Sequence, residues 1–175
     1  MKKVSISIVA VLAIGTVVLL GMALFGGGDG GNLARIKIEQ VLNKPAEEVF
    51  TLLSSHERYQ EFADFDESVL LEDGDTEKNG VGALRRLRSG RLWFQERITC
   101  FERPKKMCYH VEDNSLIPMT HELGEITIEP MSGKSKVTWM SDTRIEVPLF
   151  GSFLARRLEA ADPFSAILKG IENAD

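Results

Sequence analysis

The stretch GVGALRRLRSGRLWFQERITCFERPKKMCYHV, residues 80–111, carries the strongest fold signal in the chain. It predicts three strands, at residues 82–88, 91–101 and 106–112, because runs rich in branched and aromatic residues are separated by a Ser-Gly step and then by an Arg-Pro step. Strands joined by connections this short pair antiparallel. The centre of the chain is therefore expected to form two consecutive hairpins.

The first hairpin brings one base and one acid onto an apolar face. If Ser89 and Gly90 form its loop, Arg85 pairs with Phe94, and Glu96 lies diagonal to Arg85 on the same face. Diagonal neighbours are about 7–8 Å apart, which long side chains can span. An ion pair on an apolar face has two interpretations, which are the wall of a ligand cavity and a structural ion pair in a filled core.

The register of the second hairpin follows from hydrophobic consistency. Pairing Ile98 with Tyr109 and Glu96 with Val111 continues the apolar face, whereas a one-residue slip would bring His110 onto it. A cavity built against this face would have the following candidate ligand-binding residues: Arg85, Phe94, Glu96, Ile98, Tyr109, Val111 and, from the last predicted strand, Trp139. Among them, Arg85 is the expected anchor for a carboxylate or phosphate head group, which a guanidinium binds through two parallel hydrogen bonds. Replacing Arg85 by alanine is then expected to weaken such binding in a protein that still folds.

The chain has two cysteines, Cys100 and Cys108, on neighbouring predicted strands. In the register above, Cys100 points toward the apolar face and Cys108 points away from it, a geometry that forbids a disulfide. This register therefore predicts two free thiols. The slipped register would place the two residues opposite each other, and an exported domain would allow them to form a disulfide.

Sequence motifs for catalysis or metal binding are missing. His56, His110 and His121 do not have the spacing of metal ligands, and the sequence has no Gly-x-Ser-x-Gly elbow. His110 is expected on the outer face of its strand, as a surface histidine. We therefore predict no catalytic residue, no metal site and no cofactor.

The N-terminus differs in character from the rest of the chain. Lys2 and Lys3 precede residues 4–25, which carry no charge. About 20 apolar residues span a bilayer as a helix, so we predict a transmembrane anchor at residues 1–25 and a glycine-rich tether at residues 26–32. A cleaved signal peptide is the alternative, although its apolar region is usually only about 7–15 residues long. The two lysines favour a single-pass topology with a cytoplasmic N-terminus and an extracytoplasmic domain.

Residues 33–175 are expected to form one acidic domain. The chain has 21 Lys and Arg against 26 Asp and Glu, an acidic balance that disfavours nucleic acid as a partner. Alternating hydrophobicity at residues 33–42 predicts a strand, and two short helices follow before a run of antiparallel strands. An Asp162-Pro163 step then interrupts the C-terminal helical pattern, which predicts one long kinked helix or two helices end to end. This order predicts an α+β fold in which a curved antiparallel sheet wraps around the long C-terminal helix.

Several segments also resemble a known superfamily. KPAEEVFTLLSSHERYQEF, NGVGALRRL, FQERITCFERPKKMCYHV and the late VTW are similar to the SRPBCC or START-like superfamily, and within it to the polyketide cyclase/dehydrase and lipid-transport branch. The resemblance spans residues 33–175. It implies a helix-grip fold around a hydrophobic cavity, and it implies that the Gly80-Val81-Gly82 start, Arg85 and Glu96 occupy the recurrent positions of the family.

These observations leave three classes of function. The first is a membrane-tethered binding domain whose partner is a hydrophobic small molecule or lipid. The second is a cyclase- or aromatase-like enzyme acting on a polyketide, and the third is a tethered interaction domain with a filled core. A cavity of roughly 300–1,000 Å³ would favour a ligand and would separate the first two classes from the third.

Overall fold

The computed structural model describes residues 31–115 and 117–174, so the predicted anchor at residues 1–25 and most of the predicted tether lie outside the described residues. The elements follow in the order β1 (Leu33–Leu42), α2 (Ala46–Ser54), η1 (His56–Arg58), α3 (Tyr59–Phe62), β2 (Glu67–Glu72), β3 (Leu84–Ser89), β4 (Leu92–Glu102), β5 (Lys106–Asn114), β6 (Met119–Met131), β7 (Lys134–Ile145), α4 (Gly151–Ala161) and α5 (Pro163–Asn173). Within the described residues, no helix is both long enough and apolar enough to span a bilayer.

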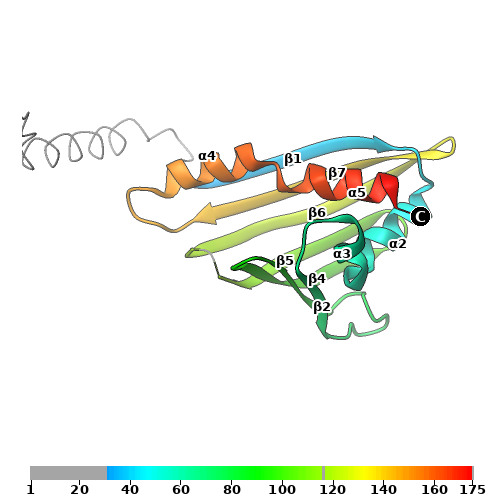
Figure 1. The fold of residues 1–175 in the computed structure, drawn as a ribbon, viewed down its shortest axis with the longest axis horizontal. Coiled ribbons are helices and arrows are strands. Elements are labelled where there is room, and N and C mark those ends of the chain that lie inside the picture. The colour runs from blue at the N-terminus through cyan, green and yellow to red at the C-terminus, as the bar shows by residue number, and fades with distance from the viewer. Residues whose placement is uncertain (1–30, 116, 175) are drawn as a thin grey trace, which may run out of the picture.

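The seven strands form one antiparallel sheet in the order β1-β7-β6-β5-β4-β3-β2. The sheet is curved, and α4 and α5 run end to end across it (Figure 1). The short helices α2 and α3 cover the sheet near the C-terminal end of α5 (Figure 1). A curved sheet gripping a C-terminal helical segment is the predicted helix-grip arrangement, and the α+β class is confirmed.

The C-terminal segment is two helices instead of one continuous helix. The break lies at Asp162, whose φ of 44° is left-handed and whose side chain accepts a hydrogen bond from the Ser165 backbone N–H. Pro163 occupies the first turn of α5, a position where the missing proline N–H costs no hydrogen bond. Beyond it, Ile167, Leu168 and Ile171 are buried, so α5 holds one apolar stripe against the sheet.

The first hairpin differs from its predicted register by two residues. Ser89 pairs with Leu92, and Arg85 pairs directly with Glu96 instead of Phe94. Gly90 begins the two-residue loop with a φ of 60°, a conformation that glycine adopts without steric cost and that short hairpin loops require. Because side chains alternate with a period of two, a shift of two residues leaves the faces unchanged. The predicted apolar face carrying one base and one acid is therefore retained.

The second hairpin follows the predicted register only in part. Glu96 pairs with Val111 and Ile98 with Tyr109 as expected, but a bulge between Ile98 and Cys100 then shifts the ladder by one residue. Cys100 consequently lies opposite Cys108, and the two form a disulfide with their Cα atoms 4.7 Å apart. The prediction of free thiols was wrong, because it assumed uniform alternation along a strand that contains an extra residue.

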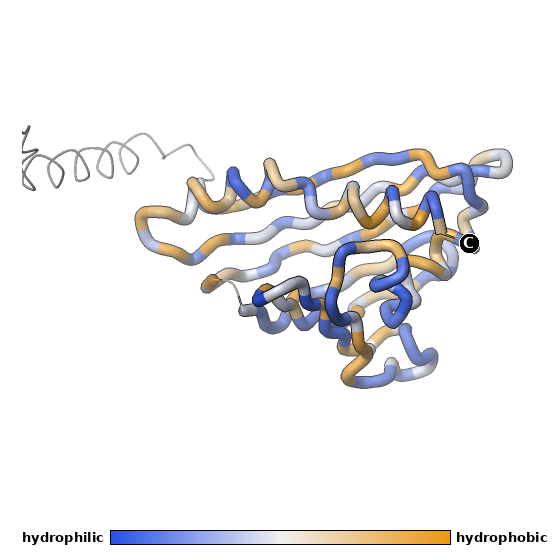
Figure 2. The backbone as a smooth tube through the Cα atoms, viewed as in Figure 1, coloured by the Kyte–Doolittle hydropathy of each residue, from blue (hydrophilic) through white to orange (hydrophobic). Residues whose placement is uncertain are grey.

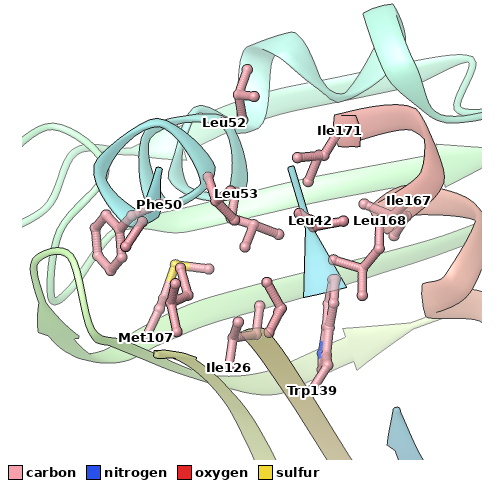
Figure 3. Packing of buried hydrophobic residues seen from close by; sticks show 14 of the residues in the cluster. Leu42, Phe50, Leu52, Leu53, Met107, Ile126, Trp139, Ile167, Leu168 and Ile171 are labelled. Carbon is pink, nitrogen blue, oxygen red and sulfur yellow. The ribbon is translucent and has the colours of Figure 1, made fainter. Parts of the chain in front are cut away.

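The buried apolar residues form two clusters. The larger one joins α2, α5 and the middle strands, and Figure 3 shows side chains from these elements, including Phe50, Met107 and Leu168, meeting in one core. The smaller one is centred on Ala34, Ile145 and Ala155, under α4. Along the strands between them, apolar and polar residues alternate (Figure 2). The space between these two clusters is where the candidate site lies.

Candidate functional site

A cavity of about 420 Å³ lies between the sheet and the two C-terminal helices. Six of the seven candidate residues line it: Arg85, Phe94, Glu96, Tyr109, Val111 and Trp139. The seventh, Ile98, does not line the cavity, because it is buried in the larger core cluster with 1% exposure. The helices add a mostly apolar opposite wall that includes Leu154, Leu158 and Ile167.

Sequence reasoning missed lining residues on the last two strands. Ser141 and Thr143 of β7 lie two and four positions beyond Trp139 and are buried on the same side of the sheet. The alternation of β7 would have identified them, since every second residue of a strand shares a face. His121 of β6 also lines the cavity, and it was set aside because only metal-ligand spacing was considered.

Arg85 lines the cavity but is almost fully buried, and its neighbours engage its polar atoms. Its side chain is 1% exposed, and its Nε and Nη2 both contact Oε2 of Glu96, at 2.7 and 2.6 Å. Its Nη1 faces the ring nitrogens of His56, with Nε2 at 3.2 Å. The guanidinium carbon lies 5.5 Å from the ring centre of Tyr59 and 5.6 Å from that of Tyr109, within the range of cation–π attraction. The cation is therefore paired, hydrogen-bonded and flanked by two aromatic rings.

This arrangement changes the role expected for Arg85. Burial alone would lower the pKa of Arg85, but Glu96, together with Tyr59 and Tyr109, outweighs burial and leaves this pKa raised. The Nε–Nη2 edge, which would bind a ligand carboxylate through two hydrogen bonds, is occupied by Glu96. Arg85 is thus a structural partner of Glu96, and Glu96 is the member of the pair that is more exposed to the cavity, with a side chain 12% exposed against 1%.

His56 is the second partner of Arg85 and was not anticipated. It is fully buried at the start of η1, and burial, followed by the nearby charge of Arg85, holds its pKa well below the usual range. Because a guanidinium has no acceptor, a ring nitrogen of His56 must accept from Nη1. The imidazole is therefore neutral and committed to holding Arg85.

The His121 side chain bonds to β5 where the backbone pairing between β5 and β6 stops. The ladder between β5 and β6 covers only three residue pairs and ends with Cys108 and Glu125. Beyond it, the imidazole Nδ1 of His121 accepts from the backbone N–H of Val111 at 3.2 Å, and its Nε2 lies 3.1 Å from Ser141 Oγ. An accepting Nδ1 leaves the proton on Nε2, which donates to Ser141. Burial, with a smaller effect of His110, lowers the pKa of His121 to about 4, so this imidazole is also neutral.

Tyr109 presents a protonated hydroxyl at the cavity. Its oxygen accepts from Trp139 Nε1 at 2.9 Å. Burial, reinforced by the charge of Glu96, raises the pKa of Tyr109 well above the usual range. The phenol thus keeps its proton near neutral pH.

The fold and cavity agree with the comparisons to known proteins. Residues 34–171 match the family described as polyketide cyclase/dehydrase and lipid transport. The chain belongs to this family. No curated protein sequence matches it.

Several solved structures have the same fold as this family member, although their sequence identity to it is low. A START superfamily protein from Mycobacterium smegmatis superposes with a TM-score of 0.65 at 12% identity, over 79% of this chain and 94% of that one. The Zhui aromatase/cyclase from Streptomyces sp. R1128 gives a TM-score of 0.65 at 12% identity, over 80% and 92%. Norcoclaurine synthase from Thalictrum flavum gives 0.62 at 11% identity, over 80% and 91%. At these identities the likeness establishes the helix-grip fold alone.

The chemistry available in this family member is limited. No cluster of three or more potential metal ligands occurs among the described residues. The two buried imidazoles are engaged by Arg85 and by the Val111 backbone. The other polar residues that line the cavity include Glu96 and Tyr109 on β4 and β5, Ser141 and Thr143 on β7, and Arg157 on α4. Such groups can orient a ligand by hydrogen bonds.

Proposed function

We propose that the protein binds a hydrophobic small molecule or lipid in this cavity, as a membrane-tethered carrier or sensor. The observation that carries the proposal is the cavity of about 420 Å³ lined mainly by apolar side chains. Ligand sites are usually cavities of roughly 300–1,000 Å³ with a few polar groups that fix orientation. A cavity of this size weighs against the alternative of an interaction domain with a filled core.

Membrane tethering rests on the sequence and is supported by one surface of the domain. Residues 4–25 carry no charge, as a spanning helix requires. Leu149, Phe150 and Phe153, at the start of α4, are 77%, 39% and 42% exposed. Asn32, which leads into β1, lies beside Gly151 in the same region. An exposed apolar surface next to the point where the tether joins the domain is consistent with a position close to a bilayer.

The disulfide supports an extracytoplasmic domain. Disulfides persist in oxidising compartments and are rare in the cytosol, and Cys100 and Cys108 are joined in the structure. The same orientation follows from the lysines at positions 2 and 3, which favour a cytoplasmic N-terminus. We therefore propose a single-pass protein whose cavity lies outside the cytoplasm.

Native mass spectrometry of the full chain, purified in mild detergent from the cells that express it, tests this proposal. We expect an adduct that extracts into organic solvent as an apolar compound. A protein that carries no adduct, and that also fails to bind added hydrophobic probes, would refute the binding function. The interaction domain with a filled core would then be the better interpretation.

The enzyme alternative is weaker but has one observation in its favour. Glu96 and Tyr109 both line the cavity and could act on a bound substrate. The high pKa of Tyr109 makes it a poor base near neutral pH, and His56 and His121 are already engaged. The measurement that separates the two functions is the mass of the ligand after prolonged incubation, because a carrier returns its ligand unchanged.

A further inference from the structure

Strands β4 and β5 each contribute one polar group with unused hydrogen-bonding capacity to the cavity wall. Both N–H contacts that Arg85 makes with Glu96 go to Oε2, which leaves Oε1 to accept from another donor. Tyr109 contributes the complementary group, because its oxygen already accepts from Trp139 while its own proton remains to be donated. This part of the wall, formed by Glu96 and Tyr109, therefore offers one acceptor and one donor.

These two groups are close enough to serve a single ligand group. Glu96 pairs with Val111, two residues along β5 from Tyr109, so the two side chains stand on the same face at diagonal positions about 7–8 Å apart at their origins. Both also adjoin the Arg85 guanidinium, which Glu96 contacts at 2.6 Å and whose carbon lies 5.6 Å from the Tyr109 ring centre. A small group placed between them can reach both.

We propose that the cavity selects a neutral hydrophobic alcohol or phenol, whose hydroxyl donates to Glu96 and accepts from Tyr109. The inference rests on the proposed binding function and specifies its ligand class. A hydroxyl group is both donor and acceptor, so it satisfies the two wall groups at once. A fully apolar ligand would leave both groups without partners in a buried site, which is costly.

The same geometry disfavours a charged head group at the position between Glu96 and Tyr109. A ligand carboxylate there would face the Glu96 carboxylate, because Arg85 is 1% exposed and its Nε–Nη2 edge already contacts Glu96. Arg157, the other arginine that lines the cavity, belongs to α4 and not to the strands that carry Glu96 and Tyr109. Two carboxylates in contact in a poorly solvated site repel strongly. An ammonium group could donate to Glu96 but has no lone pair to accept from Tyr109, and the Arg85 guanidinium in contact with Glu96 opposes its charge.

Three matched probes test the proposal with the full chain reconstituted in lipid nanodiscs. Naphthol, naphthoate and naphthalene share one ring system and differ in the group presented to the wall. Binding is followed at pH 7 by calorimetry, after subtraction of the signal from empty nanodiscs. We expect naphthol to bind about tenfold or more tightly than either of the others, the effect of one hydrogen bond to a charged group.

Two variants assign the preference to its residues. Glu96→Gln removes the charge while retaining an oxygen that accepts from Arg85, so it should reduce naphthol binding several-fold and improve naphthoate binding. Tyr109→Phe should weaken naphthol binding and leave naphthalene binding unchanged. Phe94→Leu, in the apolar lining, is the control and should affect all three probes alike.

The outcomes separate this proposal from the binding function itself. Equal or tighter binding of naphthoate by the unmodified protein would overturn the ligand class while leaving the cavity as a binding site. A naphthol preference that survives both Glu96→Gln and Tyr109→Phe would also overturn it. If none of the probes binds and the purified protein carries no adduct, the binding function fails and the ligand class falls with it.

Discussion

Arg85 and Glu96 lie directly opposite each other on β3 and β4, and the Nε of Arg85 donates to Oε2 of Glu96 at 2.7 Å in an interior where Arg85 is 1% exposed. Arg85→Met should therefore destabilise the protein by about 3–5 kcal/mol, because Glu96 would be left buried without its cation. Denaturation in urea measures this loss. The double variant Arg85→Met with Glu96→Met should recover most of the stability, since it removes both charges.

The neighbouring Arg86 provides the matched control. It belongs to the same strand but faces outward, and its ion pair with Glu67 at 2.7 Å leaves its side chain 37% exposed. Arg86→Met should cost about 1 kcal/mol or less, as exposed ion pairs do. Equal losses at Arg85 and Arg86 would mean that the buried pair is not a special contributor to stability.

The two buried neutral histidines should make stability fall in mild acid. The pKa of His121 is lowered to about 4 and that of His56 is also well below the usual value, both chiefly by burial. The unfolded chain takes up these protons near pH 6.5, whereas the folded protein does not. Stability is therefore complete above pH 6.5 and declines as the pH falls from 6.5 toward 4.

Urea denaturation between pH 7.5 and 5 measures this decline. Each histidine should contribute a slope approaching about 1.4 kcal/mol per pH unit well below pH 6.5. Toward pH 5 the carboxylates whose pKa is lowered by ion pairs, such as Glu39, Glu57 and Glu112, add a slope of the same sign, so the histidine slope is read above about pH 5.5. His121→Asn should remove about half of the slope even if it lowers stability overall. A slope that is the same in this variant would contradict the assignment.

Gly170 should resist substitution although it lies inside α5. A Cβ at this position would lie 1.6 Å from the carbonyl oxygen of Phe62, where α3 crosses α5. Alanine is favoured over glycine in a helix by about 1 kcal/mol, so propensity alone predicts that Gly170→Ala stabilises. We expect the opposite, a loss of at least about 2 kcal/mol, because backbone must move to admit the methyl group.

The comparison for Gly170 is Ala166, one turn earlier and exposed. Ala166→Gly should cost about 1 kcal/mol, the ordinary propensity difference. Thermal unfolding should therefore show a lower melting temperature for both variants, with the larger decrease for Gly170→Ala. An unchanged or higher melting temperature for Gly170→Ala would show that α3 can move away from α5 at little cost.

The disulfide between Cys100 and Cys108 should stabilise the second hairpin. The cysteines are 8 residues apart in sequence, and closing so short a loop in the unfolded chain is worth about 2 kcal/mol. The double variant Cys100→Ser with Cys108→Ser should lose this amount in urea denaturation. Dithiothreitol should lower the stability of the unmodified protein and have no effect on the double variant. A response of the double variant to the reductant would point to some other cause.

The fold and one wall of the cavity could be predicted because strands alternate with a period of two. This regularity placed Arg85, Glu96 and Tyr109 on one face, and it survived a two-residue error in the first hairpin because such an error preserves every face. It failed at the bulge before Cys100, where one extra residue reverses the alternation. Nothing in the composition of the strand marks that residue.

The roles of His56 and His121 beside the cavity could not be predicted by the same reasoning. His56 reaches Arg85 from a short helix 29 residues earlier in the sequence, and only the folded chain brings the two together. His121 has its role because β5 and β6 separate beyond Cys108, a departure from regular pairing that no periodicity reports. The contacts with His56 and Glu96 occupy the polar atoms of Arg85, which is 1% exposed, so Glu96 is the more exposed member of the pair.

The division of the cavity between sheet and helices makes its two properties independently adjustable. The hydrogen-bonding groups Glu96 and Tyr109 belong to β4 and β5, whereas Leu154 and Leu158 of α4 close the opposite side. Shortening or lengthening the α4 side chains would change the size of ligand that fits without disturbing the polar pair. A protein engineer could thus retune this scaffold for ligands of different length while keeping its chemical preference, or exchange the preference while keeping the length.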